Sequence, residues 1–311
     1  MPARSRQTRL PGLDPETPAE KADVSNRAAN ATSIDPLPET LASSVADVAA
    51  LTAIEPVAEN GASPQKETSP PKSLRGKTVY VVDSHSLIFQ VFHALPEMTS
   101  PRGEPVGAVF GFARDIMFLL EQKKPDYLFC AFDMHGPTFR HEMFAGYKEH
   151  RTEMPADLVP QIPAIERMLA ALDVPVLGVP GYEADDVLAT VARITAERGG
   201  ECIVVTGDKD CRQLLGERVK MFNVRKNQMF DAAALAEDWG VRPEQVVDYQ
   251  ALVGDPVDNI PGVPLIGPKM ARELLQKFGT LEDLYARIDE VAGGKRRDNL
   301  LLGREQAFLS R

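Results

Sequence analysis

The chain has 311 residues, of which 43% are hydrophobic and 26% charged, and its formal net charge is −10. This composition is that of a globular protein with a sizeable core, and no apolar run reaches the about 20 residues that cross a bilayer. The basic start, Met1 to Leu10, lacks the apolar core of a secretory signal. Three scattered cysteines without zinc-ligand or disulfide spacing predict a reduced, cytoplasmic protein. The negative charge disfavours nucleic-acid binding unless basic residues are concentrated locally.

The first 74 residues differ from the rest of the chain. They contain ten of the 25 prolines and no Phe, Tyr or Trp. Such a segment cannot bury enough apolar area to offset the entropy of ordering it. We therefore expect a disordered N-terminal tail over residues 1–74.

Apolar strands alternate with helices after this tail. Strands are predicted at 78–83, 126–133, 174–179 and 201–208, and helices near 87–93, 106–122, 158–172 and 187–198. This alternation predicts an α/β domain over residues 75–241, with a mostly parallel central sheet and helices on both faces. Residues 242–311 are expected to be helical only, with helices at 243–252, 267–278, 281–288 and 299–309.

Three of the predicted strands end on an acidic residue, namely Asp83, Asp133 and Asp208. Ligands of parallel sheets bind beyond the carboxyl ends of the strands, so these acids should meet at one edge. The stretch Gly181–Asp186 precedes a helix that begins at the same edge. Its Glu183, Asp185 and Asp186 crowd into about one turn, which a bound divalent cation would make favourable.

Two further acidic stretches follow, and together they give a predicted set of nine carboxylates. The set consists of Asp83, Asp133, Glu183, Asp185, Asp186, Asp208, Asp210, Asp255 and Asp258. A lone acid is more simply explained as a helix cap or turn residue, but nine at strand ends and helix starts favour a shared metal site. Oxygen ligands suit Mg²⁺ or Mn²⁺, whereas zinc would require His or Cys. Two such ions can support an in-line phosphoryl displacement.

A basic segment lies between the second strand and the helix near 158–172. Its cations are Arg140, His141, Lys148, His150 and Arg151, with Phe139, Phe144 and Tyr147 between them. Such a segment can contact phosphates and stack on bases, and its cations can neutralise charge in a transition state. The alternative is a solvated charged face. A local basic segment also answers the objection raised by the negative total charge.

The acidic motifs, taken in order, resemble the 5′-nuclease, or flap endonuclease, superfamily, closest to the 5′→3′ exonuclease domain of bacterial DNA polymerase I. They are Asp83, Asp133, GYEADD (181–186), TGDKD (206–210) and GDPVDN (254–259). The flanking stretches agree: FHAL (92–95), SPRGEPVGAVFGFA (100–113), FRHE (139–142), GYK (146–148) with Arg151, and IPGVPLIGPKMARELL (260–275). The resemblance covers about residues 77–311.

The resemblance implies a PIN/5′-nuclease-like fold with a helical arch and a C-terminal helix-hairpin-helix region. It implies two Mg²⁺ ions, which Mn²⁺ can replace, and a K⁺ site at the hairpin. The first metal would be held by Asp83, Asp133, Glu183 and Asp185, and the second by Asp185, Asp208, Asp210 and Asp255, with Asp186 and Asp258 completing the outer group. Arg140, Lys148 and Arg151 of the arch would face the scissile phosphate. DNA contacts are implied for Arg102, Phe139, Tyr147, Gly262, Gly267 and Lys269.

The function so implied is a magnesium-dependent 5′→3′ exonuclease and flap endonuclease of DNA replication and repair. Its expected partners are DNA, as 5′ flaps and nicked or gapped duplex, and a separate DNA polymerase. No membrane association is expected. The protein is expected to be a monomer associated with the nucleoid. Two alternatives remain open: a PIN-type ribonuclease with a similar carboxylate cluster, and a catalytically inactive relative that only binds junctions. The sequence also leaves open whether this is a stand-alone nuclease or a truncated polymerase I.

Two positions depart from the family pattern. The hairpin of relatives is usually Gly-hydrophobic-Gly, but this chain has Leu265-Ile-Gly267. A bulky residue resists the positive φ that Gly accepts, so the grip on duplex should be weaker here. Gln90 stands where relatives commonly have Arg, so one phosphate contact is expected to be absent.

Overall fold

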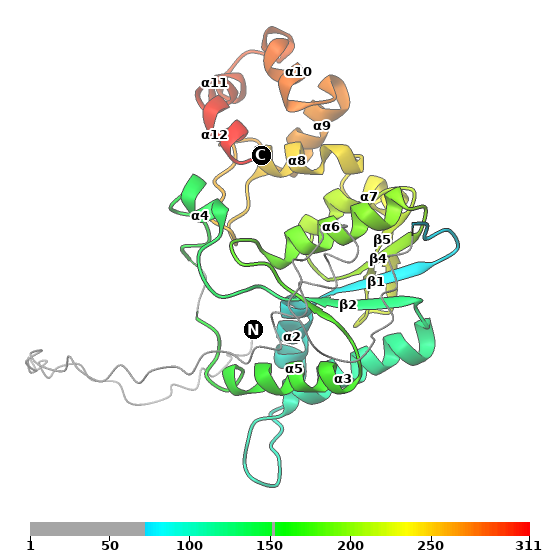
Figure 1. Ribbon diagram of the computed structural model, residues 1–311. Helices are drawn as coiled ribbons and strands as arrows, with labels where there is room; N and C mark the ends of the chain where they lie inside the picture. The colour runs from blue at the N-terminus through cyan, green and yellow to red at the C-terminus, as the bar shows by residue number, and fades with distance from the viewer. Residues whose placement is uncertain (1–71, 151–152) are drawn as a thin grey trace, which may run out of the picture. The chain divides into compact units, whose positions relative to one another are not determined.

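The computed structural model describes residues 72–150 and 153–311, which are built around a six-stranded sheet (Figure 1). The strands are β1 (Thr78–Asp83), β2 (Tyr127–Ala131), β3 (Val176–Leu177), β4 (Glu201–Val205), β5 (Val219–Asn223) and β6 (Gln228–Phe230). Their order is β3-β2-β1-β4-β5-β6, and every neighbouring pair is parallel except β5 with β6. The predicted mostly parallel sheet is confirmed.

Helices connect and follow the strands, as predicted. They are α2 (Ser84–Ala94), α3 (Gly107–Phe118), α4 (Phe139–Met143), α5 (Ile162–Ala171), α6 (Ala184–Glu197), α7 (Ala232–Asp238), α8 (Val246–Val253), α9 (Pro268–Phe278), α10 (Leu281–Ala286), α11 (Lys295–Leu302) and α12 (Arg304–Leu309). A π-helical turn, Leu119–Lys123, extends α3, and 3₁₀ turns lie at Val159–Gln161, Asp210–Leu214, Pro243–Gln245 and Ile288–Glu290. No helix in these described stretches is long and apolar enough to cross a bilayer.

The prediction missed strands β5 and β6 and the helix α7. Strand β5 is only five residues long and includes a lysine and an asparagine, and β6 has two exposed residues of three. Such short, partly polar strands carry little of the periodicity that identifies a strand. The turn between them has Asn227 at a φ of +46°, a conformation that Asn tolerates better than most residues. The Lys226-Asn227 pair was therefore the available signal for a hairpin.

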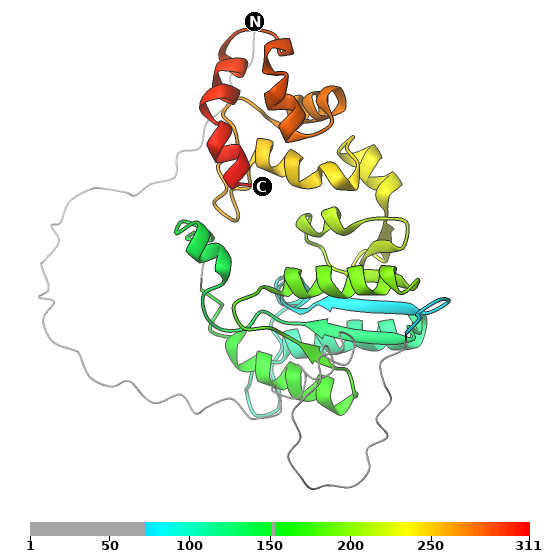
Figure 2. The same ribbon diagram turned by 45° about the horizontal axis from the view of Figure 1, so that its top comes forward.

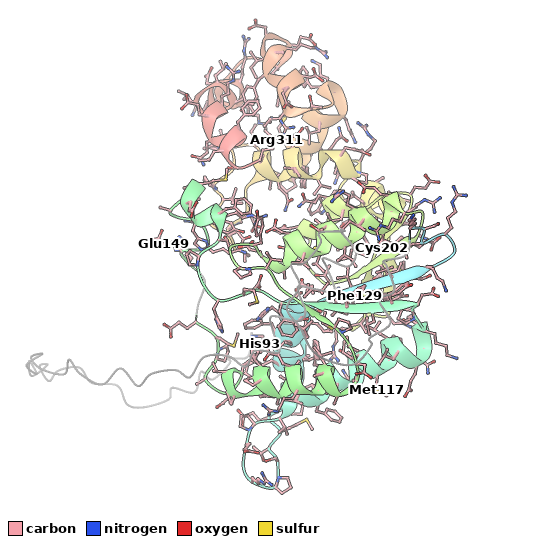
Figure 3. The ribbon with its side chains drawn as sticks, in the orientation of Figure 1. His93, Met117, Phe129, Glu149, Cys202 and Arg311 are labelled. Carbon is pink, nitrogen blue, oxygen red and sulfur yellow. The ribbon has the colours of Figure 1, made fainter. Side chains whose placement is uncertain are left out.

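One face of the sheet is covered by α6. Alternate residues of a strand point to opposite faces, and Val79 and Val81 of β1 pack in one cluster with Val187, Leu188 and Val191 of α6. Cys202 and Phe129, on β4 and β2, belong to the same side (Figure 3). The helices α8 to α10 contribute to this cluster as well, so the helical C-terminal region and the sheet share one core.

The opposite face of the sheet is covered by α2, α3 and α5 (Figures 1 and 2). Tyr80 and Val82 of β1 pack there with the fully buried Ile88, Phe112 and Ile165. Helices on both faces leave the ends of the strands open. The loops at the carboxyl ends therefore have room to carry a functional site.

Leu74, which we placed in the tail, belongs to the folded core. Its side chain is 2% exposed, and its backbone N–H donates to the carbonyl of Arg198 at 2.8 Å. The predicted boundary at residue 74 is therefore wrong for this residue, because its side chain closes the α6 layer near Gly200. The predicted disorder of residues 1–71 lies outside the described residues.

We expect a chain that begins at Arg75 to be less stable than one that begins at Lys72. The shorter chain loses the buried Leu74 side chain, whose burial contributes about 1.5–3 kcal/mol. Urea unfolding of the two chains measures the difference. The substitution Leu74→Ala in the chain that begins at Lys72 separates the side chain from the backbone contact, and equal unfolding midpoints for all three proteins would contradict the assignment.

Candidate active site at the carboxyl edge of the sheet

The three acids predicted at strand ends lie at the carboxyl edge. Asp83 ends β1, is 5% exposed, and accepts hydrogen bonds from the Thr206 hydroxyl at 2.7 Å and from the backbone N–H of Ser86 at 3.1 Å. Asp133 and Asp208 follow β2 and β4. Burial raises the pKa of Asp83 to about 6, against the effect of its hydrogen bonds, and the charges of Asp208 and Asp133 add to the rise. Asp83 therefore lies close enough to the other two carboxylates for their charges to affect it.

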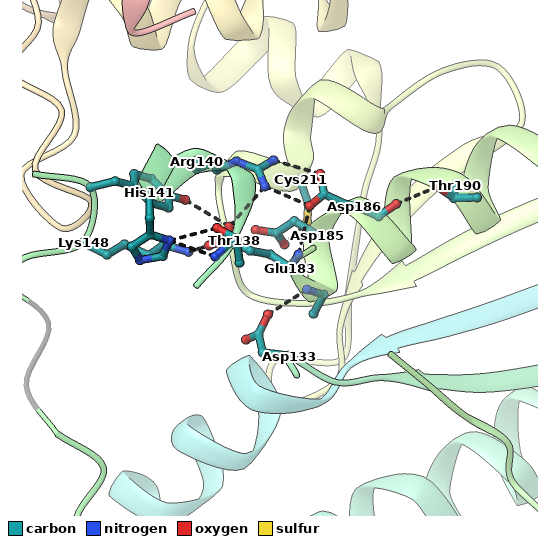
Figure 4. Close-up of polar contacts among 12 residues, drawn as sticks. Asp133, Thr138, Arg140, His141, Lys148, Glu183, Asp185, Asp186, Thr190 and Cys211 are labelled. Atoms are coloured by element: carbon teal, nitrogen blue, oxygen red, sulfur yellow. Dashed lines mark hydrogen bonds and ion pairs between the residues drawn. The ribbon is translucent and has the colours of Figure 1, made fainter. Parts of the chain in front are cut away.

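The first turn of α6 brings a second group of acids to this edge. Glu183 precedes the helix, and the Asp133 carboxylate accepts a hydrogen bond at 2.7 Å from the N–H of Ala184, the first helical residue (Figure 4). Burial, together with the charges of Asp83 and Asp208, raises the pKa of Asp185 to about 7. Asp185 thus lies among the strand-end acids.

The third group comes from the two stretches that follow β4 and α8. Asp255 is 3% exposed and pairs with the ammonium of Lys209 at 2.9 Å. The Asp210 carboxylate accepts from the side-chain amide of Gln250. Burial raises the pKa of Asp210 to about 6, and the charges of Asp208, Asp255 and Asp258 contribute to it. Asp210 is therefore close both to Asp208, which follows β4, and to Asp255 and Asp258 of the third group.

Cations of the basic segment are bonded directly to the acids of α6. The guanidinium of Arg140, in α4, donates two hydrogen bonds of 2.8 Å to Asp186 (Figure 4). The Lys148 ammonium lies 2.8 Å from one carboxylate oxygen of Glu183, and the Tyr147 hydroxyl donates to the other at 3.0 Å. Burial alone would raise the pKa of Asp186, but the hydrogen bond from Arg140 lowers it below its usual value.

The same segment is tied to the loop that carries the last acids. The backbone N–H of Lys148 donates to the carbonyl of Asp258 at 3.2 Å, and the Asn259 side chain donates to the carbonyl of Gly146 at 2.8 Å. Lys148 adopts a φ of +56°, which is strained for a residue with a side chain. Such strain persists only where surrounding contacts impose it, and it is concentrated at functional sites. The expectation for Arg151 lies outside the described residues.

The donor set fits a hard divalent cation by its chemistry. It consists of carboxylates only, and four of them are buried, namely Asp83, Glu183, Asp255 and Asp258. As they stand, no three His, Cys, Asp or Glu side chains within 72–150 and 153–311 are arranged to hold one ion. Several acids are instead bonded to Lys148, Arg140, Lys209 or Gln250. Binding of a metal ion would require some of these contacts to exchange.

A pocket of about 390 Å³ lies between the basic segment and the acids. Its lining includes Phe139, Phe144 and Tyr147 on one side, Glu183, Asp185, Asp210, Asp255 and Asp258 on another, and Leu309 and Arg311 at the end of α12. Sequence reasoning missed α12 and Gln250 as parts of this site, because no local motif marks them. Arg102, in the loop after α2, and Lys269, in α9, do not line this pocket.

The backbone around the hairpin accounts for the glycine at position 262. Gly262 has a φ of +62°, and a Cβ there would come within 2.5 Å of the Gly254 nitrogen. Gly267 precedes α9 in an extended conformation. Leu265 takes up a positive φ of +68°, and its side chain is 61% exposed. Gln90 donates to the Ser86 hydroxyl at 3.0 Å and covers Gly207, where a Cβ would lie 2.6 Å from the amide nitrogen.

We expect Leu265→Gly to tighten binding to the duplex part of a flap substrate. The change removes a positive-φ strain and lets the backbone approach a phosphate, a gain on the order of 1 kcal/mol. Because the side chain is exposed, little packing is lost. A binding titration with blunt duplex measures the effect, with Leu302→Gly, in the last turn of α11, as the control for an exposed leucine. Equal or weaker duplex binding would contradict this prediction.

The fold and the site together define a PIN-like 5′-nuclease architecture. The family model of the 5′-3′ exonuclease N-terminal resolvase-like domain matches residues 78–240, and that of the 5′-3′ exonuclease C-terminal SAM fold matches residues 241–311. The first match covers more than half of the chain. The chain belongs to the 5′-3′ exonuclease family.

Curated relatives support this membership. A 5′-3′ exonuclease of Aquifex aeolicus is 38% identical over 208 residues, which cover 67% of this chain and 72% of the relative. DNA polymerase I of Thermus thermophilus is 42% identical over 233 residues, or 75% of this chain and 28% of the relative. DNA polymerase I of Rhizobium leguminosarum is 38% identical over 245 residues, or 76% and 24%. The chain thus spans about a quarter of the length of these polymerases.

Solved structures share the fold. The 5′-exonuclease of bacteriophage T5 with bound zinc has a TM-score of 0.63 and 24% identity, over 75% of this chain and 88% of that one. The T5 flap endonuclease in complex with DNA and metal ions has a TM-score of 0.62 and 23% identity, over 75% and 87%. At identities this low, the likeness shows a shared fold and no more.

Proposed function

We propose that this chain is a metal-dependent nuclease that hydrolyses DNA phosphodiesters from 5′ ends and at the base of 5′ flaps. One observation carries the proposal: carboxylates at or just after the ends of β1, β2 and β4, at the start of α6 and in the loop after α8 lie close enough for their charges to raise the pKa values of Asp185 and Asp210, and the cations Arg140 and Lys148 are bonded to Asp186 and Glu183. A cluster of carboxylates can hold the divalent ions that stabilise the oxygens of an in-line phosphoryl displacement. The family membership and the names of the relatives agree with it.

The proposed metal ligands are divided between two Mg²⁺ ions. Asp83, Asp133, Glu183 and Asp185 would hold the first, and Asp185, Asp208, Asp210 and Asp255 the second, with Asp186 and Asp258 in the outer group. When bound, such ions lower the pKa of a bound water and stabilise the oxygens of the displacement. The T5 structures with bound divalent metal support this proposal through the shared fold.

The proposed role of the basic segment is to bind the scissile phosphate. Lys148 and Arg140 are neutralised by Glu183 and Asp186 in the free chain. Once those carboxylates have other cations as partners, Lys148 can donate to a phosphate oxygen and oppose the charge that develops there. Tyr147 holds Glu183 through its hydroxyl, and burial together with the Glu183 charge raises its pKa, so it remains a donor at neutral pH.

We further propose that residues 75–241 carry most of the catalytic residues and that residues 242–311, which add Asp255 and Asp258 to the site, bind the duplex. DNA is then the substrate, and a DNA polymerase, whether joined to this chain or separate, is the partner. The polymerases among the relatives support that partner. A cytoplasmic location beside the nucleoid would follow.

A 5′-labelled flap duplex with Mg²⁺ tests the proposal. We expect one cut near the flap base, which EDTA abolishes and renewed Mg²⁺ restores. A single-stranded RNA of the same sequence is the matched control. Degradation of the RNA in preference to the flap DNA would favour the PIN-type ribonuclease. Binding of the flap without cleavage would favour the inactive junction binder.

A further inference from the structure

Two exposed aromatic rings stand beside the acids: Phe139, which lines the pocket, and Tyr182, which has no role in the site described above. Phe139 is the first residue of α4 and is 38% exposed, and Tyr182 directly precedes Glu183 and is 50% exposed. Their ring centroids are 5.6 Å apart and their planes are inclined by 56°. Two large rings that expose apolar surface side by side provide a surface for a flat ligand.

The two rings are held in place by backbone contacts. The N–H of Phe139 donates to the carbonyl of Gly181 at 3.2 Å, and the N–H of Tyr182 donates to the carbonyl of Val179 at 3.1 Å. The neighbouring Arg140 also ties α4 to α6 through Asp186. The backbone that carries both rings is therefore fixed to the same helix start that presents Glu183 and Asp185, so a ligand has to order only the side-chain torsions of the two rings.

The geometry distinguishes the two rings. The Arg140 guanidinium lies 4.6 Å from the centroid of Phe139 and covers part of that ring. The separation of 5.6 Å between the rings is too small to admit a base between them, since stacked rings need about 3.5–4.0 Å on each side. Tyr182 is the more exposed ring, and Phe139 supports it from one side.

We propose that Tyr182, supported by Phe139, stacks on one unpaired base of the 5′ strand, next to the nucleotide that is cut. This inference rests on the proposed function and identifies a contact within it. A nucleobase fits because any base offers an aromatic face, and Arg140 places a cation beside the same surface for the adjoining phosphate. Tyr182 is one residue from Glu183, so the stacked base lies close to the proposed metal ligands.

Binding of a 5′-flap DNA in Ca²⁺ tests this stacking contact. Loss of one base–aromatic stack costs about 1–3 kcal/mol, so Tyr182→Ala should weaken flap binding by about 5- to 150-fold, while Tyr182→Trp keeps it. Phe110→Ala, which removes an aromatic ring 52% exposed on α3, is the matched control and should change nothing. Blunt duplex has no unpaired base, so Tyr182→Ala and Tyr182→Trp should bind it as tightly as the wild type does.

A scan of abasic sites along the flap locates the partner of Tyr182. At one position, loss of the base should weaken wild-type binding but not that of Tyr182→Ala, and 2-aminopurine there should be quenched by the wild type only. Unchanged flap binding by Tyr182→Ala, or an equal loss on blunt duplex, would overturn the stacking proposal. So would a loss that no abasic position reproduces, the pattern expected if the rings contact a protein instead. Failure of the wild type to bind any flap would overturn the proposed function itself.

Discussion

Asp185→Ala is expected to abolish cleavage of a flap substrate while leaving DNA binding nearly intact. Asp185 lies among Asp83, Asp208 and Asp133, whose charges raise its pKa, and it is the residue proposed to contact both metal ions. Loss of a group that organises a two-metal site removes several kcal/mol of transition-state stabilisation, or at least about 10³-fold in rate. The fold should survive, because α6 is held by Val187, Leu188 and Val191 on its buried face.

Single-turnover cleavage in Mg²⁺, beside a binding titration in Ca²⁺ at the same salt, measures this separation. Binding should stay within about tenfold of the wild type, because the cations and backbone amides elsewhere make most phosphate contacts. Glu197→Ala, at the exposed end of the same helix, is the matched control and should cleave normally. Near-normal cleavage by Asp185→Ala would remove the metal assignment and most of the mechanism built on it.

Lys148→Met is expected to lower both the cleavage rate and the stability of the metal-free protein. The ion pair of Lys148 with Glu183 is largely buried, with side-chain exposures of 12% and 8%. Removal of one partner of a buried pair costs up to about 3–5 kcal/mol, and here Arg140, 3.6 Å from Glu183, keeps part of the compensation. Loss of a donor to the reacting phosphate adds a decrease of about 10²–10³-fold in rate.

Thermal unfolding with and without Mn²⁺ distinguishes the two effects. If Lys148 serves as the counterion of Glu183 in the absence of metal, Mn²⁺ should stabilise Lys148→Met more than the wild type. Tyr147→Phe is the companion variant: it removes the hydroxyl that donates to Glu183 but no charge, so its stability should depend less on Mn²⁺. Equal stabilisation of Lys148→Met and the wild type by Mn²⁺ would show that Lys148 and the metal do not share Glu183.

The acids were predictable because local patterns placed them. Asp83 ends a continuous apolar run, and the carboxyl ends of parallel strands meet at one edge whatever the details of packing. Asp185 and Asp186 lie at the start of a helix whose apolar spacing is plain in the sequence. The order of the motifs identified the family, which the comparisons show. Strands β5 and β6 escaped prediction because they are short and partly polar.

The partners of those acids depend on contacts that no local pattern encodes. Lys148 was expected to face a phosphate, but in the free chain it pairs with Glu183, and Arg140 pairs with Asp186. Gln250 and α12 reach the site from segments far along the chain. Leu265 adopts the positive φ of a glycine because the hairpin imposes it, against its own preference.

The sequence by itself determined the kind of protein, since apolar periodicity sets the sheet and helices, and the order of the acidic motifs identified the family. Only the tertiary structure decided the state of the site, because an acid bonds to whichever donor folding brings within about 3 Å, and that donor can come from any segment. The same holds for Leu74. The composition of the segment around it indicated a tail, but its side chain fills the core beside Gly200. Burial and pairing are properties of the folded chain, and residue order alone does not specify them.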